Sequence, residues 1–232
     1  MNRSSRPSVN DRSKTRVTFG RGPWLLVFLS LLVITLTLSV ARSGQRRCQE
    51  PSVAITVKGV RFAVPQNYFP LPPPPCDTEQ SAFPIRALFP DFSGSTPETF
   101  EEFHHVGGGW GRVVSILVQS ARPSPELEFF VSRWDDRWHI QWSDRPLHGL
   151  ETGSYKSPGW NWDVFVERGG GIITHVMQCT SPESVPYPGC EGILFFKGVQ
   201  VHFHFDRQLL PEWRTIHDGV VTLLERFDQS HR

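Results

Sequence analysis

Residues 213–227, Trp-Arg-Thr-Ile-His-Asp-Gly-Val-Val-Thr-Leu-Leu-Glu-Arg-Phe, decide the fold class of this 232-residue chain. Their large apolar side chains recur at spacings of three and four, which places them on one stripe of a helix: Trp213, Ile216, Val220, Leu223 and Phe227. Gly219 weakens such a helix by about 1 kcal/mol relative to Ala. The helix must therefore owe its stability to packing, and the sequence predicts that it packs on a β-sheet.

The strands of that sheet are indicated by short alternating or continuous apolar runs bounded by Gly or Pro. These runs lie at 52–58, 60–64, 82–88, 111–120, 160–167, 171–179, 193–197 and 199–206. A further hairpin is predicted over 126–142, where side chains alternate on either side of Asp135-Asp136. We expect an α+β fold, an antiparallel sheet of roughly seven to nine strands with the C-terminal helix on one face.

Toward the N-terminus, residues 24–41 contain no charged side chain and come close to the roughly 20 apolar residues that span a bilayer as a helix. Residues 1–22 carry six basic side chains and one acidic side chain, a net charge of +5. Such a segment stays in the cytoplasm under the positive-inside rule. A cleaved signal peptide ending at Ala41 is the alternative, and it would export the same domain.

We therefore predict four segments: a disordered basic cytoplasmic tail at 1–22, a transmembrane signal anchor at 23–41, a linker at 42–51 and a periplasmic α+β domain at 52–232. The protein is then a single-pass protein of the inner (cytoplasmic) membrane. Residues 42–232 carry 18 Lys or Arg and 22 Asp or Glu, a net charge of −4. This acidic balance argues against nucleic acid as a partner, because nucleic acid favours a basic surface.

All four cysteines, Cys48, Cys76, Cys179 and Cys190, follow the predicted membrane segment. An even number in an oxidising compartment indicates two disulfides. We favour Cys48–Cys76 and Cys179–Cys190, the pairs that are nearest in sequence. A zinc site is the alternative, but neither pair has the short spacing that such sites use.

His202 and His204 alternate with Phe203 and Phe205 along one predicted strand, so the two imidazoles share a face. Two such imidazoles could bind a metal ion. A polar sheet face opposite a phenylalanine core explains the same alternation, and we favour it. An exported metal-binding protein or hydrolase that uses these histidines remains the alternative function.

Catalytic motifs do not support an enzyme: the sequence has no G-x-S-x-G nucleophile elbow and no P-loop. We assign no catalytic residue and no cofactor. Tryptophan is abundant, and Trp134, Trp160 and Trp162 form a candidate binding surface, since aromatic faces bind peptides and sugars. Burial in the core explains the tryptophans as well, and we favour it because Trp138 and Trp142 alternate with His139 and Gln141.

The segments Val60-Arg-Phe-Ala-Val-Pro65, Leu88-Phe-Pro-Asp91 and Leu210-Pro-Glu-Trp213 carry a resemblance. In these segments the chain resembles uncharacterised bacterial proteins that have one N-terminal membrane span and an exported domain. Some exported bacterial proteins of this build are similar to immunity proteins against secreted toxins. The strand that ends in Pro65 and the final helix that ends in Phe227 also resemble Mog1/PsbP-type antiparallel-sheet domains, which mostly bind or scaffold. These resemblances imply binding of another protein and no enzymatic activity.

Overall fold

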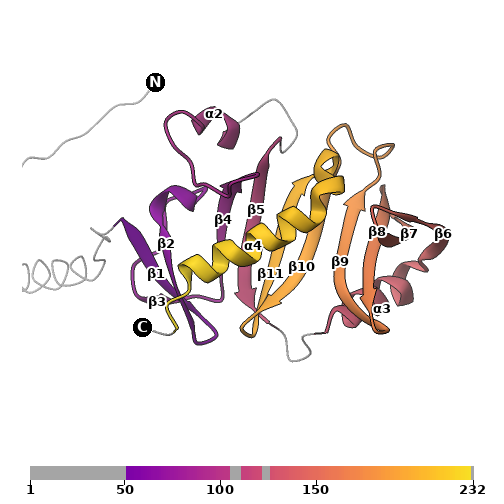
Figure 1. Cartoon of the computed structure of the whole chain (residues 1–232), viewed down its shortest axis with the longest axis horizontal. Coiled ribbons are helices and arrows are strands. Elements are labelled where there is room, and N and C mark those ends of the chain that lie inside the picture. Colours follow the sequence, from indigo (N-terminus) through magenta and orange to yellow (C-terminus); the bar gives the residue numbers. More distant parts are fainter. Residues whose placement is uncertain (1–50, 105–110, 122–125, 231–232) are drawn as a thin grey trace, which may run out of the picture. The chain divides into compact units, whose positions relative to one another are not determined.

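The computed structural model describes residues 51–104, 111–121 and 126–230. The cytoplasmic tail and the membrane anchor predicted within residues 1–41 lie outside this range, as does the linker up to residue 50. Within the described ranges, no helix is long and apolar enough to cross a membrane. The described residues form two sheets and two longer helices (Figure 1).

The elements occur in this order: β1 (Ser52–Val57), β2 (Val60–Pro65), the 3-10 helix η1 (Gln66–Tyr68), β3 (Thr78–Glu79), β4 (Ala82–Leu88), α2 (Phe100–Phe103), β5 (Val113–Ser120), α3 (Leu127–Trp138), β6 (Gln141–Leu147), β7 (Leu150–Ser157), β8 (Trp160–Gly169), β9 (Ile172–Thr180), β10 (Gly189–Phe196), β11 (Val199–Asp206), the 3-10 helix η2 (Arg207–Glu212) and α4 (Trp213–Phe227).

The large sheet has eight strands in the order β4-β5-β11-β10-β9-β8-β7-β6, and every neighbouring pair is antiparallel. The predicted antiparallel α+β architecture with a C-terminal helix is therefore confirmed. The sequence had placed β1 and β2 in the same sheet as the other strands. They instead form a separate sheet of order β2-β1-β3, in which β1 and β3 are parallel.

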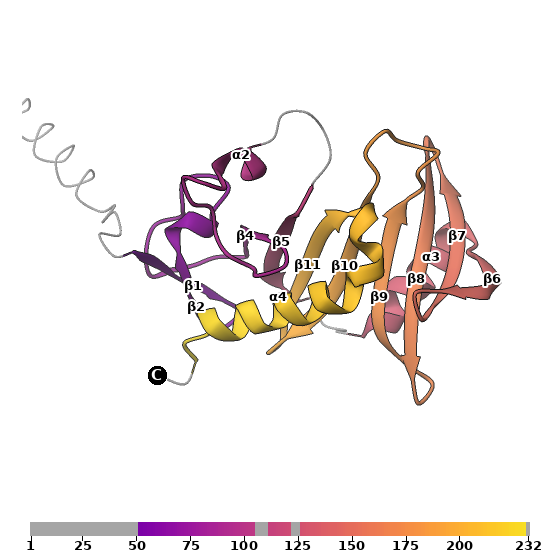
Figure 2. The same cartoon turned by 45° about the horizontal axis from the view of Figure 1, so that its top comes forward.

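Helix α4 crosses one face of the large sheet, as Figures 1 and 2 show from two directions. The five predicted stripe residues are all buried, and Leu224 is buried beside them. They share one core with Phe203 and Phe205 of β11 and with the inward-facing residues of β1. Burying a large apolar side chain contributes roughly 1.5–3 kcal/mol, so this stripe accounts for the docking of the helix.

The predicted hairpin at 126–142 is wrong, because most of this segment is helix α3 and only its end enters strand β6. Val131 is buried in α3, and Leu127, Phe130, Trp134 and Trp138 pack around it in a second core. These five residues recur at helical spacing, although apolar and polar side chains of the segment also fit an alternating pattern. Tertiary packing selects the helical pattern. Asp135 lies inside the helix, where its carboxylate accepts a hydrogen bond from the Ile140 backbone at 2.8 Å.

Helix α3 lies on the sheet face opposite α4, over β7 and β9 (Figures 1 and 2). Its second core takes Tyr155, Val164, Val176 and Ile193 from the sheet, all distinct from the residues under α4. Glu128 fixes the start of α3, since its carboxylate accepts a hydrogen bond from the Ile173 backbone at 2.6 Å. The large sheet is therefore covered on both faces, but by different helices at different strands.

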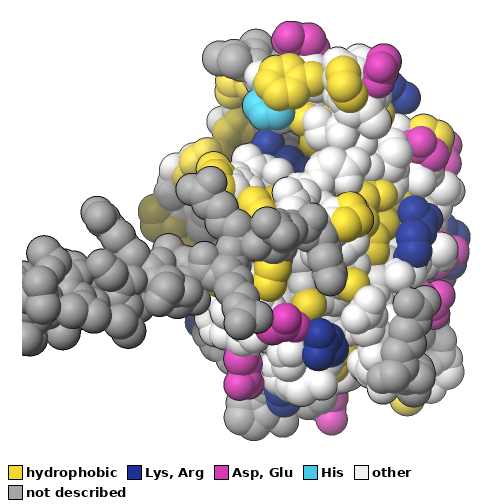
Figure 3. Space-filling view, turned by 90° about the vertical axis from the view of Figure 1, so that its left-hand side faces the viewer, with side chains coloured by type: hydrophobic (Ala, Val, Ile, Leu, Met, Phe, Trp, Pro, Cys, Tyr) yellow, Lys and Arg dark blue, Asp and Glu magenta, His cyan; other side chains and the backbone are white. Residues whose placement is uncertain are grey.

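Figure 3 shows one side of the molecule, on which basic and acidic side chains are interspersed with apolar side chains between them. Opposite charges also lie next to each other in three surface ion pairs: Arg61–Asp77, Arg112–Glu102 and Arg168–Glu151. On the face that Figure 3 shows, the charges are not gathered by sign.

Candidate functional site

The predicted histidine pair lies on the α3 face of the large sheet. Phe203 and Phe205 of β11 point into the core under α4, so His202 and His204 point to the opposite face, as their alternation predicts. His202 contacts the ring of Phe130 on α3, with 6.5 Å between ring centroids. The two histidines therefore lie on a partly exposed sheet face that ends against a helix.

A chain of hydrogen bonds runs across this face from β11 to β7. The Glu191 carboxylate on β10 is its centre, and it accepts hydrogen bonds from His202 Nδ1 at 2.5 Å and from Gln178 Nε2 at 2.8 Å. Gln178 Oε1 accepts a hydrogen bond from the Tyr155 hydroxyl at 2.9 Å. At the other end, Gln200 Nε2 donates to His202 Nε2. Such a connected network holds its members in one arrangement.

The network leaves Glu191 ionised. Burial alone would raise the pKa of its carboxyl group, but hydrogen bonds from His202 and Gln178, together with the nearby His204, outweigh burial and keep the pKa below its ordinary value. Burial lowers the pKa of His204, even though Glu191 opposes that effect. Near pH 7 the face therefore combines the Glu191 charge with a neutral His204.

Tyr155 remains a hydrogen-bond donor over the same pH range. Burial, with a smaller effect from the Glu191 charge, raises the pKa of its hydroxyl group to about 12. The hydroxyl group thus stays protonated and continues to donate to Gln178.

Four aromatic rings form a row along the same face. Trp138 of α3, Tyr155 of β7 and Trp162 of β8 are nearly parallel, with ring centroids 6.3 and 6.4 Å apart. Trp160 continues the row, 6.5 Å from Trp162. We call these four residues the aromatic row. Its outer end is accessible, since Trp160 is 47% exposed.

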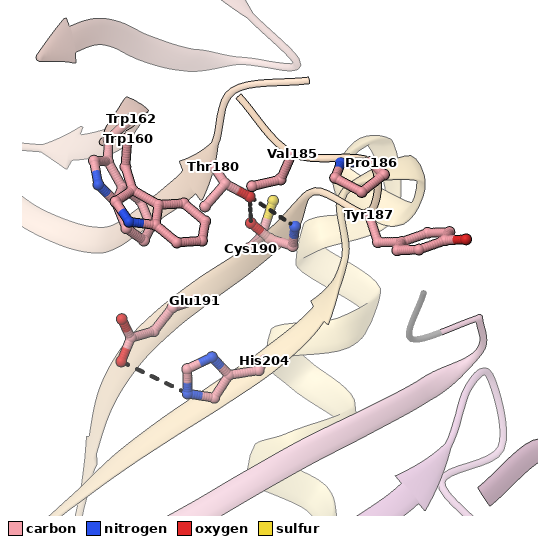
Figure 4. Close-up of a pocket in the computed structure, with 10 residues that line it drawn as sticks. Trp160, Trp162, Thr180, Val185, Pro186, Tyr187, Cys190, Glu191 and His204 are labelled. Atoms are coloured by element: carbon pink, nitrogen blue, oxygen red, sulfur yellow. Dashed lines mark hydrogen bonds and ion pairs between the residues drawn. The ribbon is translucent and has the colours of Figure 1, made fainter. Parts of the chain in front are cut away.

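The outer end of the row opens into a hollow of about 400 Å³, which we call the Glu191 hollow. Figure 4 shows Trp160 and Trp162 at one side, the Glu191–His204 pair below them and Tyr187 extending from the loop at the other side. Glu191 Oε1 lies 3.7 Å from His204 Nε2. The hollow thus combines aromatic walls with a charged carboxylate.

The loop that carries Tyr187 is fixed by the disulfide between Cys179 of β9 and Cys190 of β10, and this predicted bond is present. The two cysteines are direct partners in the β9–β10 register. The Gly189 N–H also donates to Thr180 Oγ1 at 3.0 Å. Cys76 also takes part in a disulfide, whereas Cys48, its predicted partner, lies outside the described residues.

A second hollow, of about 320 Å³, lies between α3 and the sheet. Arg133, Trp134 and Arg137 line it from the helix, while Tyr155 and Trp162 line it from the strands. Trp162 belongs to both hollows, so the structure brings all three predicted surface tryptophans to one continuous face. The Arg137 guanidinium lies over the Trp138 ring, with Cζ 4.8 Å from the ring centroid.

The metal-binding alternative finds no third ligand in the part of the chain that the structure describes. No group of three or more His, Cys, Asp or Glu side chains there is placed to hold a metal ion. Both ring nitrogens of His202 already take part in hydrogen bonds, with Glu191 and with Gln200.

Glu191, the centre of this site, is not among the predicted site residues. A signal for it exists, because Gly198 at the β10–β11 turn fixes the hairpin register. Counting back from the Phe196–Val199 pair places Glu191 directly opposite His204, as the structure has it. Gln178 and Tyr155 carry no comparable signal, since their meeting depends on how β7, β8 and β9 pair.

No protein-family model matches the sequence, and no curated protein matches it. Two solved structures are similar in fold. An immunity protein of the Stenotrophomonas maltophilia type IV secretion system matches with a TM-score of 0.58 and 14% identity, covering 77% of this chain and 94% of that one. The iron-regulated outer membrane lipoprotein FrpD of Neisseria meningitidis matches with a TM-score of 0.52 and 12% identity, covering 77% and 92%. The TM-scores show a shared fold, and at these low identities the likeness shows the fold alone.

Proposed function

We propose that this chain is a single-pass inner-membrane protein whose periplasmic domain binds another protein in an immunity-like role. The aromatic row beside Glu191 is the observation that carries this proposal. Tryptophan, tyrosine and arginine dominate the binding energy of protein interfaces, and this face gathers all three types between α3 and the disulfide-bonded loop. The fold similarity to an immunity protein supports the same role.

The rigidity of the face supports protein binding as well. Side chains that are already ordered lose less conformational entropy on association. Tyr155 and Glu191 are held by the hydrogen-bonded network, and Trp162 Nε1 donates to Ser157 Oγ at 3.1 Å. A partner would therefore meet a preformed surface.

Site-specific photocrosslinking tests the binding surface. A benzoylphenylalanine residue at position 160 of the full chain in its native membrane should crosslink to one partner, which mass spectrometry then identifies. Position 142 is the matched control, because Trp142 of β6 is 43% exposed and Trp160 is 47% exposed. Equal crosslinking of the same partner from both positions would contradict the proposed surface.

Affinity measurements with the purified partner complete the test. Trp160→Ala should weaken binding by a factor of ten or more, because truncating a central aromatic residue costs about 2 kcal/mol or more. Trp142→Ala should leave the affinity unchanged. A partner that binds both variants as tightly as it binds the unaltered chain must use another surface.

The immunity-like part of the proposal has its own experiment. The identified partner, exported to the periplasm of a host that lacks this chain, should stop growth, and co-expression of the chain should restore it. Trp160→Ala should protect poorly, whereas Trp142→Ala should protect fully. A partner that is harmless in the periplasm rules out immunity while leaving protein binding intact.

The proposed topology is tested by fusions. Alkaline phosphatase, which folds only in an oxidising compartment, should be active after Arg232 and inactive after Arg21. The opposite pattern would overturn the proposed orientation.

A further inference from the structure

The Glu191 hollow contains an ionised carboxylate, and no Lys or Arg side chain among the described residues lies within ion-pair distance of it. Its side-chain neighbours there are His202, His204 and Gln178. Both ring nitrogens of His202 are already in hydrogen bonds, Nδ1 with the carboxylate and Nε2 with Gln200. His204 is neutral near pH 7, since burial lowers its pKa.

Hydrogen bonds stabilise this carboxylate as an anion, so it presents a negative charge to the hollow. The Glu191 side chain is 21% exposed, and its charge attracts a cation that can reach it. The hollow is open at Trp160 and Tyr187, which are 47% and 54% exposed. A cation from outside can therefore approach Glu191 on the side of the hollow where Trp160 lies (Figure 4).

The aromatic walls select the kind of cation. The faces of Trp and Tyr attract cations, and a planar guanidinium stacks on them better than an ammonium does. A guanidinium also matches a carboxylate with two parallel hydrogen bonds. Among the described residues, guanidinium groups already lie over tryptophan rings, Arg137 over Trp138 and Arg214 over Trp213.

We propose that the Glu191 hollow receives an arginine side chain of the protein partner, stacked on Trp160 and ion-paired with Glu191. This inference rests on the proposed function, because it names the part of the partner that the face recognises. A volume of about 400 Å³ is large enough for one long side chain with bridging water.

A small probe tests the hollow without knowledge of the partner. N-acetyl-arginine methylamide is titrated into the full chain in nanodiscs, and the indole N–H signals of 15N-labelled tryptophan are followed by NMR. We expect saturable shifts at Trp160 and Trp162 with a dissociation constant on the order of 1 mM, typical of a ligand this small. The citrulline analogue, which has the same shape without the charge, should bind at least tenfold more weakly.

Two variants make the assignment specific. Glu191→Gln keeps the size of the side chain and should weaken arginine binding about tenfold, while the citrulline analogue is unaffected. Trp160→Leu should weaken the arginine probe as well, and Trp142→Leu is its control. If Glu191→Gln does not fold, as judged by its NMR spectrum, the Trp160→Leu comparison decides.

Several results would overturn the inference. If the arginine and citrulline probes bind equally, the positive charge does not contribute to binding. If a lysine probe binds as tightly as the arginine probe, the hollow does not select a guanidinium group. Arginine binding that persists in both variants places the probe elsewhere.

The proposed function and this inference can fail separately. A partner that crosslinks at position 160 but binds Glu191→Gln unchanged overturns the inference and leaves the function standing. If the arginine probe binds as expected but position 160 captures no partner, the proposed function is wrong. The inference that the partner supplies an arginine is then wrong as well.

Discussion

The ring of Phe92 lies directly against Gly219 in the middle of α4. A Cβ atom added to Gly219 would come within 2.0 Å of Phe92 Cε2 and within 2.4 Å of its Cζ. Phe92 belongs to the segment between β4 and α2, and its ring is 3% exposed. Gly219 thus allows this segment to pack closely on the helix, at a position where an alanine would favour the helix itself.

This contact reverses the usual effect of replacing a helical glycine. Gly219→Ala in an exposed helix would stabilise by about 1 kcal/mol, but here the added methyl group collides with Phe92. We expect a loss of about 1–3 kcal/mol of unfolding free energy, as for other overpacked sites. Urea denaturation followed by tryptophan fluorescence measures it.

A double variant separates the collision from other effects. In a Phe92→Ala background the ring is absent, so adding Gly219→Ala should be neutral or stabilising. If Gly219→Ala costs the same free energy in both backgrounds, the Phe92 contact is not the reason for the glycine.

The elements with one dominant periodicity were predictable from the sequence. The stripe from Trp213 to Phe227 has a single helical interpretation, and the β10–β11 hairpin has a glycine at its turn. Residues 127–138 fit both an alternating pattern and a helical pattern. Only packing against β7 and β9 decides between them, and a short segment carries no information about that partner.

The candidate site shows the same division. Local alternation predicts that His202 and His204 share one face of β11, and it places Trp160 and Trp162 on one face of β8. Their proximity to Trp134 depends on α3, a segment whose sequence pattern predicts a strand instead. The network through Gln178 and Tyr155 depends on strand order in the large sheet, which pattern alone does not specify.

The α4 stripe should be structural, with a large difference between two adjacent residues. Trp213 is 2% exposed, and its Nε1 donates to the His148 carbonyl at 3.1 Å, so Trp213→Ala should cost about 3–5 kcal/mol. The Arg214 side chain is 58% exposed and pairs with Glu167, an interaction worth about 0–1 kcal/mol. Thermal denaturation compares the two variants, and similar melting temperatures would mean that α4 is not docked as described.

The Cys179–Cys190 disulfide should stabilise the chain and hold the wall of the hollow. The cysteines are 11 residues apart, and a loop of this length corresponds to about 3 kcal/mol. The Cys179→Ala/Cys190→Ala variant should unfold at correspondingly lower urea concentration, with increased hydrogen exchange at Tyr187. A variant as stable as the unaltered chain would show that the β9–β10 pairing suffices without the bond.

The protein should lose stability as the pH falls from about 7 to about 5, and His175 should contribute to that loss. Burial lowers the pKa of His175, with a further effect from His217, against the opposing hydrogen bond to Glu167. The unfolded chain, with an ordinary His pKa of about 6.5, then binds a proton more readily than the folded chain does. The stability from neutral His175 is thus fully present above about pH 6.5 and is lost as the pH falls through the lower folded value.

His175→Gln should reduce the slope of unfolding free energy against pH in this window. His104→Gln, at an exposed position after α2, is the matched control. Equal slopes for His175→Gln and the unaltered chain, measured by urea denaturation at half-unit pH intervals, would show that the buried imidazole does not control this acid sensitivity.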